Sequence, residues 1–184
     1  SVVLVAADAN DAADEANEGN NEKGASIAVE TVVDYVAKAN LADWKSGTPE
    51  TDLSFGGSTG DSNGFACYRT SAKLEDGDTY AKVLETHPKW VNNGWIDGFY
   101  PEVTVPAGAW FVAGVGFLSG ATGSDGVTFR VWFWQDGVDI PSVLDDVAAE
   151  YDGDLDELNI SLSSIAGRTG RIGLQVLAGA SSGQ

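Results

Sequence analysis

The chain has 184 residues, of which 43% are hydrophobic, and its 28 acidic and 10 basic residues give a net charge of −18. This charge argues against a nucleic-acid partner, since phosphate contacts need clustered Lys and Arg. No apolar run approaches the roughly 18 residues that a membrane span needs. The length and apolar content predict one domain, residues 26–184, preceded by an N-terminal arm, residues 1–25.

The arm begins with a short apolar, β-branched run, SVVLVAA, in which Val2, Val3, Leu4 and Val5 form a candidate strand. A polar tether rich in Gly and Asn follows at Asp8–Ala25. Such a tether buries too little apolar surface to order itself. We expect the strand to insert into a neighbouring molecule, because an exposed sheet edge gains a full ladder of backbone hydrogen bonds. The alternatives are pairing with an edge strand of its own domain and ordering by crystal contacts.

The rest of the chain reads as a succession of short strands. The segment Glu30–Ala37 fits strand or helix, and its Val and Tyr favour strand; Asn40–Gly64 reads as a long loop. Ile140–Ala149 also fits helical spacing, and Ser163–Gly167 resembles a short helical turn. Strands are predicted at Gly64–Thr70, Thr79–Glu85, Glu102–Val105, Ala109–Leu118, Val127–Gln135, Val143–Tyr151, Leu155–Leu162 and Arg171–Ala178.

Alternation within these strands predicts two packed sheets. In Val127–Trp134 the residues Val127, Phe129, Val131 and Phe133 share one face, and Thr128, Arg130, Trp132 and Trp134 share the other. Burial of one face of each strand is typical of a sandwich. The predicted fold is an all-β, jelly-roll-like antiparallel β-sandwich of about eight or nine strands, with an extended N-terminal strand and tether.

The sequence does not point to an enzyme. His87 is the sole histidine, and no Gly-x-Ser-x-Gly motif accompanies it. The 28 acidic residues single out no catalytic pair. We therefore expect His87 to stabilise its loop. Cys67 has no partner for an internal disulfide and is predicted to be a small buried hydrophobic residue.

The sequence calls for no cofactor, and a structural calcium is the alternative that its acidic loops suggest. The run Asp152–Glu157 places Asp152, Asp154 and Asp156 at alternating positions, and calcium binds six to eight oxygens. The run lacks the later Gly and closing Glu of an EF-hand. The alternative is an ordinary acidic turn on a solvated strand face.

Two further features suggest glycans. Trp90, Trp95 and Tyr100 lie among amides and a carboxylate in Lys89–Pro101, and sugar rings stack on aromatic faces. Trp132 and Trp134 share a strand face and could add a platform. The alternative is that these aromatics roof one end of the sandwich. Asn159 begins an Asn-Ile-Ser sequon and is a candidate glycosylation site.

Several stretches resemble β-sandwich modules of large secreted bacterial proteins, over residues 31–184. The resemblance implies a sandwich that lacks one strand, a gap that residues Ser1–Ala7 of a neighbour could fill. It implies no activity and no site residues. The stretches that carry it are Val33–Ala39 with Trp44, Gly60–Phe65, Leu74–Gly77, Leu84–Trp90, Gly98–Pro101, Gly116–Gly120, Tyr151–Gly153 and Leu162–Gly167.

These features together favour a non-enzymatic structural subunit of an extracellular filament or surface assembly. In this hypothesis the subunit polymerises with itself by donating Val2–Val5, in the manner of a pilus-like or adhesive filament. Ser1 in place of Met fits removal of a signal peptide, and hence secretion. The first alternative is a secreted carbohydrate-binding module that uses Trp90, Trp95 and Tyr100, and the second is a virion surface protein.

Overall fold

The computed structural model describes residues 2–5 and 33–180. The tether Asp8–Ala25 lies outside these residues. The strands are β1 Val2–Val5, β2 Asp43–Gly47, β3 Thr51–Leu53, β4 Phe65–Lys73, β5 Thr79–His87, β6 Trp95–Phe99, β7 Val103–Thr104, β8 Trp110–Phe117, β9 Val127–Gln135, β10 Ser142–Ala149, β11 Asp156–Ser161 and β12 Thr169–Ala178. Two short 3-10 helices, η1 Ala39–Leu41 and η2 Leu162–Ile165, complete the elements.

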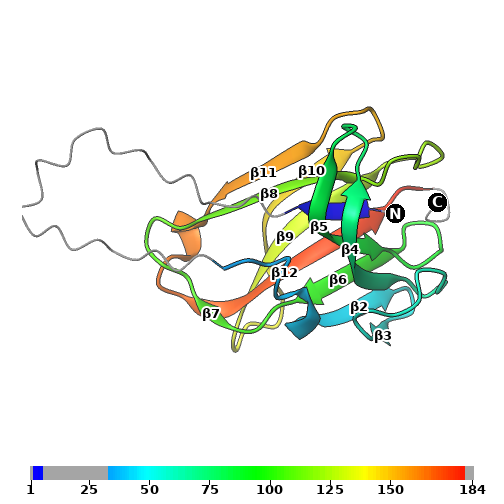
Figure 1. Ribbon diagram of the computed structural model, residues 1–184. Coiled ribbons are helices and arrows are strands. Elements are labelled where there is room, and N and C mark those ends of the chain that lie inside the picture. Colours follow the sequence, from blue (N-terminus) through cyan, green and yellow to red (C-terminus); the bar gives the residue numbers. More distant parts are fainter. Residues whose placement is uncertain (1, 6–32, 181–184) are drawn as a thin grey trace, which may run out of the picture.

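Two antiparallel sheets pack face to face (Figure 1). The first, which we call sheet A, has the order β11-β8-β1-β5-β4. The second, sheet B, has the order β10-β9-β12-β6-β2-β3, and β7 pairs with β12 at its margin. The predicted all-β antiparallel sandwich is confirmed.

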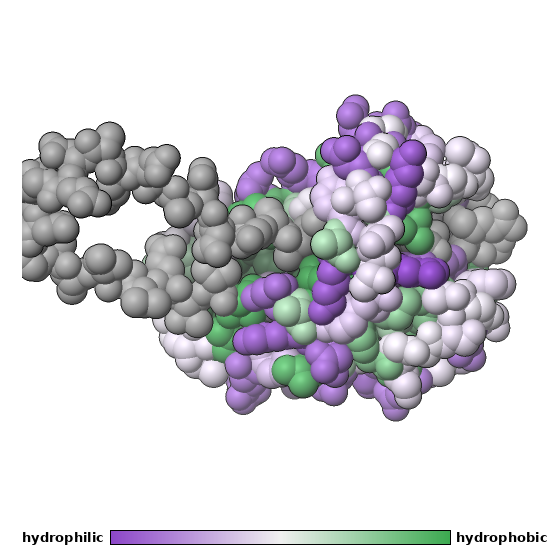
Figure 2. Space-filling view, in the orientation of Figure 1, coloured by the Kyte–Doolittle hydropathy of each residue, from purple (hydrophilic) through white to green (hydrophobic). Residues whose placement is uncertain are grey.

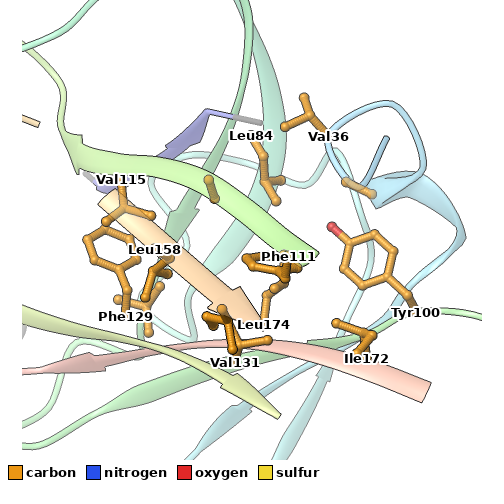
Figure 3. Close-up of a cluster of buried hydrophobic side chains, with 14 of the residues drawn as sticks. Val36, Leu84, Tyr100, Phe111, Val115, Phe129, Val131, Leu158, Ile172 and Leu174 are labelled. Atoms are coloured by element: carbon orange, nitrogen blue, oxygen red, sulfur yellow. The ribbon is translucent and has the colours of Figure 1, made fainter. Parts of the chain in front are cut away.

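The core fills the space between the sheets with alternate residues of each strand (Figure 3). Val127, Phe129, Val131 and Phe133 of β9 are all buried, as their alternation predicts. Leu84 and Val115 of sheet A point toward Val131 and Leu174 of sheet B. This central cluster draws residues from both sheets, from Val36 to Val176.

Three strands of the structure were not predicted from the sequence. The predicted loop Asn40–Gly64 contains β2 and β3, and the aromatic run Lys89–Pro101 contains β6. The predicted strand at Glu30–Ala37 is wrong where it can be seen, since Val33–Ala37 forms no strand and runs into a turn. Ile140–Ala149 holds β10 and is not helical, whereas the helical turn predicted at Ser163–Gly167 is present as η2.

A close aromatic contact explains how the short strand β2 is held. The indole of Trp44 is buried, and its Nε1 donates a hydrogen bond of 2.8 Å to the carbonyl of Ala39. The ring lies directly against Gly98 of β6, because a Cβ added there would stand 2.5 Å from ring carbons of Trp44. Glycine at position 98 is therefore required by the close approach of this ring.

We predict that Gly98→Ala destabilises the protein by about 1–3 kcal/mol, because the new methyl group forces the Trp44 ring out of its position. The matched control is Gly123→Ala, at a turn glycine that has no atom within 4 Å of an added Cβ. Urea unfolding monitored by tryptophan fluorescence measures both. Equal midpoints for the two variants would contradict this packing.

Candidate functional site

The candidate site is the gap between β5 and β8, which β1 fills. Val2, Val3 and Leu4 pair with Thr86, Glu85 and Leu84 of β5. Val2 through Val5 pair in turn with Phe117, Gly116, Val115 and Gly114 of β8. Neighbouring strands lie about 4.8 Å apart, so β5 and β8 are separated by roughly twice that distance. Within the described part of the chain they are joined as sheet neighbours only through β1.

The inner side of the gap is apolar. Leu84, Val115 and Phe117 are each no more than 1% exposed and belong to the central core cluster. A strand that enters the gap therefore meets a dry floor as well as two ladders of backbone partners. Such a site recognises an extended apolar segment through its main chain.

The outer side of the gap carries an ion pair between the buried Glu85 and the partly exposed Arg69. Glu85 is fully buried, and its carboxylate accepts from Nε of Arg69 and, at 3.4 Å, from Nη2. The Sγ of Cys67 lies 3.6 Å from Glu85 Oε2. Burial, with the Glu85 charge second, raises the pKa of Cys67 to about 11. Cys67 is a free, buried thiol, and the predicted burial is confirmed.

The hairpin of β4 and β5 spans β1. The end of the hairpin away from its tip pairs with one side of β1, through Leu84–Thr86 of β5. Its tip, residues 72–80, which we call the strap, reaches β8 on the other side, where Leu74 forms a bridge with Leu118. Figure 1 shows the hairpin rising across β1. In the same orientation Figure 2 shows hydrophilic side chains gathered over its tip.

Glu75 attaches the strap to β8 and to the loop before β11. Its Oε1 accepts from the backbone N–H of Phe117 at 2.7 Å, and its Oε2 accepts from those of Asp152 and Gly153 at 3.0 and 3.4 Å. The Glu75 N–H donates to the carbonyl of Phe117. Burial raises the pKa of Glu75, and the three N–H donors act in the opposite direction.

The predicted calcium residues lie beside this attachment. The backbone of Asp152 binds Glu75, while its Oδ1 accepts from the N–H of Asp154 in a tight turn, and Asp156 begins β11. In residues 33–180 no group of three or more His, Cys, Asp or Glu is placed to hold a metal ion. Calcium at Asp152, Asp154 and Asp156 stays a prediction. Asn159 lies exposed on β11, where its Nδ2 donates to Glu157.

The structure does not bring the predicted glycan residues together. Tyr100 is in the core, 2% exposed, with its ring edge against Tyr35. Trp90 is exposed and lies against His87, which is stacked in turn on Phe65. Trp95 lies on β6, one residue before the inward-facing Ile96. The prediction that these three residues form one binding face is therefore wrong, because Tyr100 is in the core, Trp95 lies on β6 and Trp90 lies on a separate loop.

His87 has the structural position expected of it. Its Nδ1 lies 2.7 Å from the carbonyl of Pro88, and its ring is held between Phe65 and Trp90. Burial lowers its pKa. These contacts hold the loop that follows β5.

A polar row crosses the outer face of sheet B. The register aligns Asp146, Arg130, Gln175, Asp97, Lys45 and Asp52 on six neighbouring strands. Arg130 binds Asp146 through Nε and Nη2 at 3.0 and 2.8 Å. Among the residues that the structure describes, Asp97 Oδ1 is buried and has no hydrogen-bond partner. Burial raises the pKa of Asp97 to about 7, against smaller opposing effects of Gln175 and Arg130.

Comparison with known proteins identifies no relative: no protein-family model matches the chain, and no curated protein or solved structure is found to be similar. In the described part of the chain, neither helix is long and apolar enough to cross a membrane.

The strand Val2–Val5 was predicted from the sequence, and the residues that it pairs with were not. The glycines at 114 and 116, which pair with β1, alternate in the run Gly-Val-Gly, a pattern that could have indicated a close approach over one face of β8. The role of Glu75 could not be predicted, because it lies in an acidic turn, Glu-Asp-Gly-Asp, that resembles many others in the chain. No local signal shows that its carboxylate reaches backbone groups 42 and 77 residues away.

We predict that the free energy of unfolding falls as the pH rises from about 4 to about 7. Native Asp97 keeps its proton up to a pH near 7, whereas an unfolded Asp loses it near pH 4. Asp97→Asn removes this titration, so the difference between wild type and variant changes with pH by a few kcal/mol, at about 1.4 kcal/mol per pKa unit. Urea unfolding at several pH values measures it. Parallel pH profiles for the two proteins would refute the raised pKa, and Asp139→Asn, at an exposed turn, is the control.

Proposed function

We propose that this protein is the structural subunit of an extracellular filament or surface assembly, in which Val2–Val5 of one copy fill the gap between β5 and β8 of the next. The observation that supports the proposal is the position of β1. It is the central strand of sheet A, yet 27 residues of sequence, 6–32, separate it from Val33, the next residue that the structure describes.

The contacts that β1 makes within one chain are the same as those it would make with a second chain. In the single chain described here, β1 completes its own sheet; an identical strand from another copy would find the same register and the same dry floor. Exchange of an identical element is a route to assembly that needs no new surface. Because donor and acceptor sites differ, each copy donates its strand to the next and accepts one from the copy before. Such a contact generates an open polymer when the rotation between copies does not close a ring.

The protein concentration decides whether β1 fills the gap of its own chain or that of another copy. A strand on a tether faces its own gap at an effective concentration on the order of millimolar. Assembly at lower protein concentration therefore needs either further contacts between subunits or a slow return of β1 to its own gap. The net charge of −18 keeps the subunits soluble before they assemble.

We predict that Leu4→Pro abolishes filaments. Leu4 lies between Leu84 and Val115 in the middle of the sheet, and proline supplies no N–H to either ladder. Leu4→Ile, which keeps an apolar residue suited to a strand, is the matched control. Negative-stain electron microscopy and sedimentation measure the assembly state of both. Filaments from Leu4→Pro, or monodisperse monomers from the intact chain at millimolar concentration, would overturn the proposal.

A further inference from the structure

The strap closes the gap from outside. Glu85 and Gly116 flank position 3 of β1 on its two sides, and the strap extends from the first of these strands to the second. At Gly116 an added Cβ would stand 2.7 Å from Glu75 Oε1 and 2.5 Å from Cδ2 of Leu155. The strap therefore lies directly on the outer face of β8, at a position where only glycine leaves room for it.

The attachment of the strap to β8 is separate from its root on β5. Besides the contacts of Glu75, the N–H of Ser119 donates to the carbonyl of Lys73 at 3.0 Å. Ala72 and Leu74 form, with Val83, a small apolar cluster of their own, against which Tyr80, Leu118 and Leu155 pack. This cluster is distinct from the central core. The strap can thus detach from β8 without opening the sandwich.

The strap is stiff within itself. The N–H of Asp78 donates to Asp76 Oδ1 at 3.0 Å, and the hydroxyl of Tyr80 donates to Asp76 Oδ2 at 2.7 Å. Gly77 has a φ of 89°, which a tight turn requires. Because these bonds lie inside the strap, it moves as a unit when its contacts with β8 break.

We propose that the strap is a gate on strand exchange, and that Glu75 holds this gate closed through its hydrogen bonds. β1 leaves its gap sideways, or a second copy's strand enters, only after the strap has released Phe117, Asp152 and Gly153. This inference rests on the proposed function, since it concerns the rate at which that exchange takes place. A closed strap keeps β1 in its own chain until the strap opens.

The direct test holds the strap closed by a disulfide. Residues 73 and 119 are both exposed and lie opposite each other beside the Leu74–Leu118 bridge. Opposite residues of an antiparallel pair have Cα atoms about 5.5 Å apart, which suits a disulfide. The probe is a fluorescein-labelled peptide of residues 1–8, and its uptake by excess full-length Lys73→Cys/Ser119→Cys protein is followed by fluorescence polarisation.

We expect uptake to be at least about tenfold slower in the oxidised protein, and to recover when a reductant opens the disulfide. Lys73→Cys alone is the control, and the native thiol Cys67 is buried and stays unreactive. Equal rates in the oxidised and reduced double variant would overturn the gate, because they would show that β1 slides out along its axis beneath a closed strap.

The complementary test opens the strap. Glu75→Ala removes the acceptor of three backbone N–H groups, so we expect peptide uptake about tenfold faster or more. Asp139→Ala, at an exposed turn remote from the gap, is the control, and circular dichroism verifies that both variants are folded. An unchanged rate in folded Glu75→Ala would overturn the role of Glu75. Failure of every variant, Glu75→Ala included, to take up peptide would overturn strand exchange itself as well as the gate.

Discussion

The fold depends on the filling of one gap in a sheet. β5 and β8 present facing edges that lie too far apart to pair with each other, and each edge carries N–H and C=O groups that need partners. A four-residue strand satisfies both, with three aligned residues on β5 and four on β8. Each backbone hydrogen bond contributes about 1 kcal/mol net, so this short segment has a large effect on a marginally stable domain.

The groups around the gap make its filling specific. Leu84 and Val115 give it an apolar floor, and the buried Glu85 carboxylate lies beside it, paired with the partly exposed Arg69. A buried carboxylate is costly to leave without its partner, so the ion pair with Arg69 holds the outer wall of the gap in place. The gap therefore selects an extended apolar strand, and the strap limits the entry of that strand and its release.

Much of the fold followed from the sequence where burial imposes a strict alternation. β9 and β11 were predicted almost to the residue, because one face of each lies in the core. β2 and β3 were missed, since short strands with polar outer residues resemble a loop, and β6 was concealed by its aromatics. The strand Val2–Val5 was predicted, but its pairing with β5 and β8 was not. The gap is formed by strands far apart in sequence, and Glu75 acts on backbone groups that carry no sequence signal.

Assembly by strand exchange requires that β1 of one copy occupy the gap of another. Val2 and Thr86 are opposite in the register, so Val2→Cys in one chain and Thr86→Cys in a second chain make a pair that can cross-link only between molecules. The two chains are mixed at high concentration, oxidised, and run on a non-reducing gel beside each chain alone. Strand exchange predicts a covalent dimer in the mixture only. A mixture without that dimer, while a chain with both cysteines forms the disulfide internally, would contradict exchange between subunits.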